Sequence, residues 1–117
     1  MMLIPPGVNV HLAPGFTDLR RGLDGLAVMV EQILERDPFS GHMFAFRGRR
    51  ADMIKILYWD GTGLCLFVKR LEDGYFPWPM TAGQNTTVQL TSAQLSMLIE
   101  GLNWEKPERA WRPAVAG

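Results

Sequence analysis

The sequence contains very little of the chemistry from which small metal and redox sites are built. It has one cysteine, Cys65, and two histidines, His11 and His42. A single thiol excludes an internal disulfide and any site made of several cysteines, and it fits a reducing, cytoplasmic setting. The histidines lie 31 positions apart, with no acidic residue or cysteine at ligand spacing. A metal site would require the fold to bring them together, and we expect neither a metal ion nor another cofactor.

Long apolar runs and catalytic motifs are also missing. No uninterrupted apolar run approaches the ~20 residues of a membrane-spanning helix. A secretory signal would have basic residues followed by an apolar segment, and we do not find this pattern at the start of the sequence. There is no glycine-rich phosphate loop and no nucleophile elbow. The acidic residues nearest the central strands are scattered, and Asp60 and Asp73 fall in turns, where aspartate is favoured for its own backbone hydrogen bonds. We therefore expect no membrane association, no catalytic residues and no enzymatic activity.

Charge is balanced overall but unevenly placed. The chain has 12 basic and 12 acidic residues, yet the stretch from Phe44 to Leu71 holds six basic and only two acidic ones. Guanidinium groups match phosphate oxygens in bidentate geometry, and Gly48 would let the backbone approach a ligand closely. One hypothesis is a nucleic-acid-binding site, and the alternative is a solvated turn with ordinary solubilising charges. The residues concerned are Arg47, Arg49, Arg50, Lys55, Lys69 and Arg70.

The stretch from Gly41 to Pro79 predicts three consecutive strands joined by tight turns. Residues 44–46 form an apolar run, and residues 52–59 and 64–70 alternate between two faces. The sequence Asp60-Gly61-Thr62-Gly63 is typical of a hairpin turn, because aspartate and glycine tolerate the backbone angles that it needs. Alternation of this kind indicates an antiparallel meander.

Shorter elements flank the meander. Residues 8–12 and 86–90 predict strands. Apolar residues at helical spacing from Leu23 onward predict a helix that ends at Asp37-Pro38. Thr17 or Asp18 could cap it, which would place Arg20 and Arg21 in its first turn. Thr91 to Gln94 matches a capping box and predicts a second helix up to about residue 102.

Together these elements predict one α+β domain. We expect an antiparallel β meander of about five strands with two amphipathic helices packed on one face of it, spanning residues 1–105. Residues 106–117, which contain two prolines, would form a surface or disordered tail. The expected core consists of Leu26, Val30, Ile33, Ile56, Leu66, Val68, Leu95 and Leu98.

A set of aromatic residues accompanies the basic ones. Aromatic rings could stack on exposed bases or anchor a protein–protein contact, since both kinds of surface use them. The alternative is packing inside the core. The predicted interaction surface consists of Tyr58, Trp59, Tyr75, Phe76 and Trp78, and Trp104 belongs to the same aromatic set.

Three stretches of the chain resemble one known family, in the same order. They are TDLRRGLDGL at 17–26, GHMFAFRGRRADMIKILYWDGTGLCLFVKRLEDGYFPWP at 41–79, and LTSAQLSMLIEG at 90–101. Together they resemble the insertion-sequence sixty-six accessory protein, also called TnpB. The resemblance implies a role in transposition beside a separate transposase, with no agreed catalytic residues. An unrelated RNA-guided nuclease shares the name TnpB, and its activity should not be transferred to this short chain.

From the residues and the resemblance we expect a non-enzymatic transposition accessory protein. It would bind DNA weakly and without sequence preference, or the transposase or other proteins of the element, through a basic, aromatic-rich sheet surface. Two alternatives are a small hydrolase or nuclease that processes element ends and a structural module that forms homo-oligomers. If the six basic residues form one contiguous exposed face, binding is favoured. If they are dispersed or paired with acids, oligomerisation is favoured.

Overall fold

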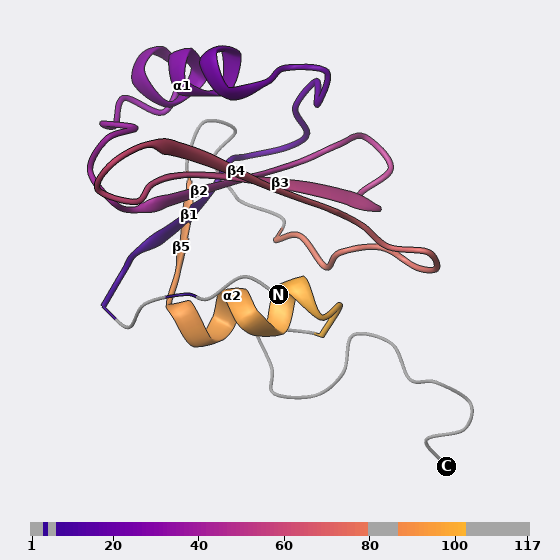
Figure 1. Ribbon diagram of the computed structural model, residues 1–117. Coiled ribbons are helices and arrows are strands. Elements are labelled where there is room, and N and C mark those ends of the chain that lie inside the picture. The colour runs from indigo at the N-terminus through magenta and orange to yellow at the C-terminus, as the bar shows by residue number, and fades with distance from the viewer. Residues whose placement is uncertain (1–3, 5–6, 80–86, 103–117) are drawn as a thin grey trace.

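A computed structural model describes residues 4, 7–79 and 87–102 of the 117-residue chain. Along these residues the elements follow the order strand, helix, three strands, strand, helix (Figure 1). Their bounds are β1 Val10–Leu12, α1 Leu23–Gln32, β2 Met43–Arg47, β3 Met53–Trp59, β4 Leu64–Arg70, β5 Val88–Leu90 and α2 Ser92–Ile99. No helix in these ranges is long and apolar enough to cross a membrane.

The strands form one five-stranded sheet in the order β4-β3-β2-β1-β5. The meander β2-β3-β4 is antiparallel, as the alternation predicts, and β5 is antiparallel to β1. β1 and β2, however, run parallel, because α1 lies between them in the chain and makes the crossover that a parallel pair needs. The predicted α+β class is confirmed, with a sheet that is mixed and mostly antiparallel.

The two helices cover opposite faces of the sheet, and the expectation that both pack on one face is wrong (Figure 1). On one face α1 packs with Phe44, Phe46 and Leu57. On the other, α2 packs with Val10, Ile56 and other strand residues. The inner strands are apolar on both faces, so each face needs its own cover, and the result is three layers: helix, sheet, helix.

Most of the predicted core is confirmed. Leu26, Val30, Ile56, Leu95 and Leu98 are all 0% exposed, while Leu66 is half-buried. Ile33 and Val68 are wrong predictions, because their exposed fractions are 56% and 49%. α1 ends at Gln32, so Ile33 lies just past its apolar stripe. Val68 belongs to an edge strand that has a neighbouring strand on one side only.

The helix starts differ in how well the sequence predicts them. The capping box of α2 is confirmed: the Thr91 hydroxyl accepts from the Gln94 amide at 3.1 Å, and the Gln94 side chain accepts from the Thr91 amide at 2.9 Å. α1 instead begins after Gly22 without a side-chain cap. Neither proposed residue caps it, because the Asp18 carboxylate pairs with Arg20. Because α1 begins only at Leu23, Arg20 and Arg21 lie in the loop before the helix and not in its first turn.

Candidate nucleic-acid interface

The loop that follows β1 runs beside the end of β2 and meets the turn between β2 and β3. The Thr17 amide donates to the Arg47 carbonyl at 2.8 Å. At Gly48, an added Cβ would lie 3.3 Å from the Leu19 side chain, so glycine allows the loop and the turn to approach closely. Two basic sequence motifs that are far apart in the chain thus lie at one end of the sheet.

An open cleft of about 770 Å³ lies between this loop and this turn. Its lining contains three arginines and two aspartates, so its charge is positive by a small margin. The residues that line it are Phe16, Thr17, Asp18, Leu19, Arg20, Gly48, Arg49, Arg50, Asp52 and Met53. We call this cleft the basic cleft.

The three arginines of the basic cleft have different surroundings. Arg20 donates to both Asp18 oxygens, with a shortest distance of 2.7 Å, and this pairing holds the pKa of the Asp18 carboxyl well below its usual range. The guanidinium of Arg49 lies 4.6 Å from the centre of the Phe16 ring, a cation–π contact. Arg50 is exposed and has no hydrogen bond or ion pair within the part of the chain that is described. Arg49 and Arg50 therefore carry the charge that the aspartates leave uncompensated.

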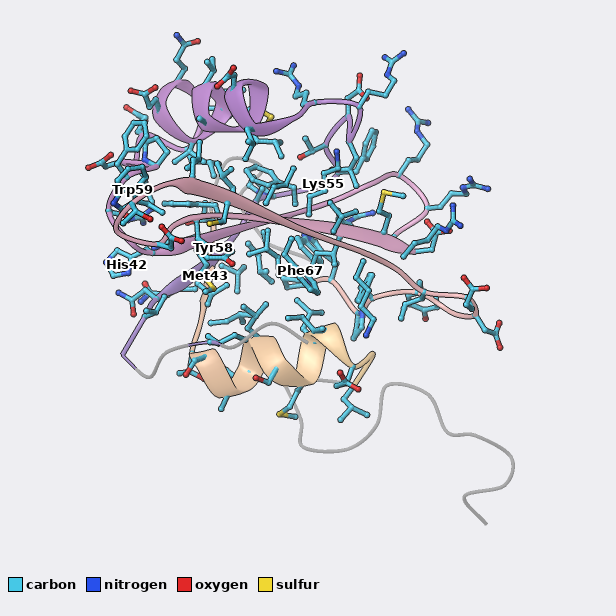
Figure 2. All side chains as sticks on the ribbon, viewed as in Figure 1. His42, Met43, Lys55, Tyr58, Trp59 and Phe67 are labelled. Atoms are coloured by element: carbon cyan, nitrogen blue, oxygen red, sulfur yellow. The ribbon has the colours of Figure 1, made fainter. Side chains whose placement is uncertain are left out.

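The six predicted basic residues do not form one face. Lys55 points toward α1 (Figure 2), and its ammonium donates to the Arg21 carbonyl at 3.0 Å. Lys69 points the other way and donates to the carbonyl of Ile99 in α2 at 2.8 Å. Each lysine is therefore held by a main-chain acceptor on a different face of the sheet.

The arginines of the predicted set divide in a similar way. Arg47 is half-buried, and burial lowers its pKa; its Nε is buried without a hydrogen-bond partner among the described residues. Arg49 and Arg50 are exposed at the cleft. Arg70 is exposed and pairs in register with Met53, which lines the cleft. Only part of the set therefore gathers at the basic cleft.

Sequence reasoning missed Arg20 and Arg21 as members of this basic region. It placed them in the first turn of a helix, whereas α1 begins only at Leu23. Phe16 and Leu19 continue the helical apolar spacing toward the N-terminus, so local spacing does not mark this stretch as a loop. The fold brings this loop to the arginine turn, and spacing in the sequence does not encode such a contact.

The predicted aromatic interaction surface does not exist as one surface. Phe76 is 0% exposed and belongs to the core, so its assignment to a surface is corrected. The Trp78 indole donates to the Ala13 carbonyl at 3.0 Å and packs against the same core. Tyr58 also packs there, on the α2 side of the sheet (Figure 2). Packing against the core, the alternative for these aromatics, accounts for all three.

The remaining aromatics lie apart from one another. Trp59 is half-buried and meets Phe39 edge to face, with ring centres 5.5 Å apart. Tyr75 is 64% exposed. Trp104 lies outside the described residues. The exposed aromatic ring at the basic cleft is Phe16, which the sequence analysis did not select.

The fold does bring the two histidines together. Their ring centres lie 6.1 Å apart, edge to face, and His11 also stacks on Phe44 at 5.4 Å. His42 accepts a hydrogen bond from the Asn9 amide at 3.1 Å. Burial, helped by the charges of Arg36 and His42, lowers the pKa of His11 to about 4. Among the described residues no group of three or more His, Cys, Asp or Glu side chains could hold a metal ion.

Comparison with known proteins identifies the family. Residues 8–109 match the profile described as IS66 Orf2 like protein. The chain belongs to this family. The match spans the loop and the arginine turn that form the basic cleft, as well as both helices.

Two relatives from Sinorhizobium fredii (strain NBRC 101917 / NGR234) extend the comparison. The uncharacterized protein y4hO is 41% identical over 117 residues, which cover 98% of this chain and 100% of the relative. The uncharacterized protein y4jC is 35% identical over 103 residues, 88% of this chain and 86% of the relative. No solved structure matches the chain.

Membership of the IS66 Orf2-like family connects the chain with transposition of insertion sequences. Membership of the family indicates an accessory role in that process, and the family is not a known family of enzymes. The resemblance based on three sequence stretches is thereby confirmed. Within the described residues, the basic cleft is the candidate binding site for a partner molecule.

Proposed function

We propose that this transposition accessory protein binds the phosphate backbone of DNA through the basic cleft. The observation that carries the proposal is the meeting of two basic segments, 16–21 and 47–50, at one end of the sheet. A hydrogen bond from Thr17 and the close approach of Leu19 to Gly48 hold these segments together. Arg49 and Arg50 are the phosphate ligands, and Arg21, Lys55 and Arg70 extend the positive charge around them.

This site differs from the six-residue set that the sequence predicts. Lys69 bonds to α2 on the opposite face and Arg47 is half-buried, so neither forms part of the proposed site. Arg20 lines the cleft, but its charge is already matched by Asp18. The binding is therefore expected to be weak and without sequence preference, because contacts to phosphates carry no sequence information.

A second candidate for the basic cleft is an acidic segment of the transposase. Phe16 is 52% exposed and lies under the Arg49 guanidinium, and exposed aromatic and arginine side chains also dominate protein–protein contacts. Competition separates the two candidates. DNA should prevent the transposase from binding if both use the cleft, and should not if the transposase docks elsewhere.

A nuclease remains the less favoured alternative. Metal-dependent cleavage needs several converging carboxylates. The cleft holds two, Asp18 and Asp52, and Asp18 is engaged by Arg20. That the chain is not an enzyme stays a prediction, and its family membership supports it.

The DNA-binding proposal can be tested with the double variant Arg49→Ala, Arg50→Ala. The parent should bind labelled duplex DNA with a dissociation constant on the order of 10⁻⁶ M at low salt, and log affinity should fall with log salt by ~0.9 per phosphate contact. In the double variant binding should weaken and the slope should flatten by about two units. Fluorescence anisotropy at several salt concentrations measures both quantities.

The matched control is Arg36→Ala, which removes an exposed arginine that does not line the cleft. It should leave the salt slope unchanged. The melting temperature of the double variant should stay near that of the parent, because both arginines are exposed. A folded double variant that binds DNA as the parent does, or a parent that binds no DNA, would overturn the proposal.

A further inference from the structure

The two edges of the sheet are unequal. β5, at one edge, has three residues, whereas β4, at the other, has seven. Edge strands present unpaired amide and carbonyl groups, and natural proteins blunt such edges with short strands, prolines or charges. β5 is short enough to be protected in this way. β4 reads Leu-Cys-Leu-Phe-Val before its first charge, and it contains no proline.

The hydrogen-bond pattern shows which groups of β4 point outward. The Asp60 amide donates to the Gly63 carbonyl, and the Leu71 amide donates to the Asp52 carbonyl. These two pairs continue the β3–β4 register at its two ends, and they show that Gly63, Cys65, Phe67, Lys69 and Leu71 direct their backbone groups toward β3. Antiparallel ladders alternate bonded and non-bonded pairs, so every second residue of β4 turns its backbone groups away from β3. These outward residues are Leu64, Leu66, Val68 and Arg70. Within the described ranges none of them has a backbone hydrogen bond on the free side.

Apolar side chains accompany these free backbone groups. Leu64 to Phe67 are half-buried although they belong to an edge strand, and Val68 is 49% exposed. Side chains on both faces of β4 would therefore gain cover from one more strand. We propose that β4 pairs antiparallel with β4 of a second copy of this chain, so that one sheet continues across a two-fold axis.

The charges of β4 favour a second copy in this orientation. Lys69 and Arg70 end the strand, and the turn at Asp60 precedes its start. If the two strands pair antiparallel with Phe67 opposite Phe67, the outward backbone groups of one copy meet the outward backbone groups of the other. Arg70 then lies opposite Leu64 of the second copy. The turn that carries Asp60 of the second copy is next to that position. A parallel arrangement would put the two basic ends side by side, which is unfavourable. Such a self-complementary two-fold contact is also the commonest arrangement of homo-oligomers.

The self-pairing inference is independent of DNA binding. It agrees with the dispersal of Lys55 and Lys69 to opposite faces, the arrangement that favours an oligomerisation role. The contact is one strand wide, so the dimer should be weak and its population should depend on concentration. The double variant Arg49→Ala, Arg50→Ala should therefore dimerise as the parent does, even where it has lost DNA binding.

The test is the variant Val68→Pro, with Val68→Thr as its matched control. Proline removes an outward amide that makes no bond to β3, and edge strands accept proline at such positions. Threonine keeps both the amide and the β-branched shape. By sedimentation, the parent and Val68→Thr should approach twice the 13.2 kDa of one chain as concentration rises, and dimer formation by Val68→Pro should be at least ~10-fold weaker.

Amide hydrogen exchange of the parent gives a second measurement that does not depend on how the proline variant folds. The amides of Leu66 and Val68 should become protected as concentration rises, while the amide of Phe67, already bonded to β3, should change little. A parent that stays monomeric at every concentration would overturn the inference. So would a folded Val68→Pro that still dimerises, or outward amides that exchange freely in the dimer.

Discussion

At the scale of the residue, Gly48 decides how closely the loop before α1 approaches the arginine turn. From the sequence, Gly48 is expected to let the backbone approach a ligand closely, because glycine tolerates unusual backbone angles. In the structure the left-handed residue of the turn is Ala51, with φ of 60°. Gly48 is needed for space, because a Cβ would press on Leu19. The importance of Gly48 could be predicted from the sequence. The cause could not, because it is a tertiary contact with Leu19.

His11 is a second residue whose environment the sequence does not reveal. We predicted no role for it, and it is 3% exposed, stacked on Phe44. Burial lowers its pKa from 6.5 to about 4, so the folded protein holds it neutral over a range where the unfolded chain takes up a proton. Above pH 6.5 His11 is neutral in both states and does not change the free energy of unfolding. As the pH falls from 6.5 toward 4, the unfolded chain is stabilised by protonation of His11 and the free energy of unfolding decreases.

This loss can be measured with His11→Phe, which keeps a ring beside Phe44 and removes the titrating group. Between pH 7 and pH 4.5 the free energy of unfolding of the parent should fall by about 2 kcal/mol because of this residue. The variant should lose correspondingly less. Urea unfolding at the two pH values gives both differences, and equal losses in parent and variant would show that His11 does not cause the decline.

At the scale of the element, strands and helices were predictable where local pattern decides them. The alternation of residues 52–59 and 64–70 gave β3, β4 and their hairpin, in which the Asp60 carboxylate accepts from the amides of Thr62 and Gly63. These backbone bonds lower the pKa of Asp60 to about 2. The start of α1 was not predictable, because the nearest capping candidate, Asp18, is engaged by an arginine two residues later.

The capping box of α2 should contribute measurably to the stability of the protein. Thr91→Ala removes the acceptor of the Gln94 amide and should lower the free energy of unfolding by about 1 kcal/mol. Thr91→Ser keeps an acceptor at the same position and should recover most of that loss. Thermal or urea unfolding measures the difference. If alanine and serine variants proved equally stable, the cap would contribute nothing to α2.

At the scale of the whole molecule, the order of the strands and the faces covered by the helices were beyond reach of the sequence. Local pattern shows that Phe44 and Ala45 are both apolar, but not which helix covers which. The basic cleft could likewise be predicted only in part from local sequence. Its arginine turn was predicted from neighbouring residues, whereas the loop that completes it arrives through the parallel pairing of β1 with β2.

The three-layer arrangement also predicts how the molecule unfolds. Ile56 and Leu57 are neighbours in β3, both 0% exposed, and they pack on opposite faces. Replacing either with alanine should cost about 2–5 kcal/mol through lost transfer energy and a cavity. Because both layers share one sheet, each variant should still unfold in a single transition. Circular dichroism and tryptophan fluorescence should therefore report the same midpoint.

Val28→Ala, at a position in α1 that is 44% exposed, is the control and should change stability by less than about 0.5 kcal/mol. If Leu57→Ala instead produced two separate transitions, the α1 layer would be folding independently of the α2 layer, and the shared sheet would not be the unit that holds the protein together.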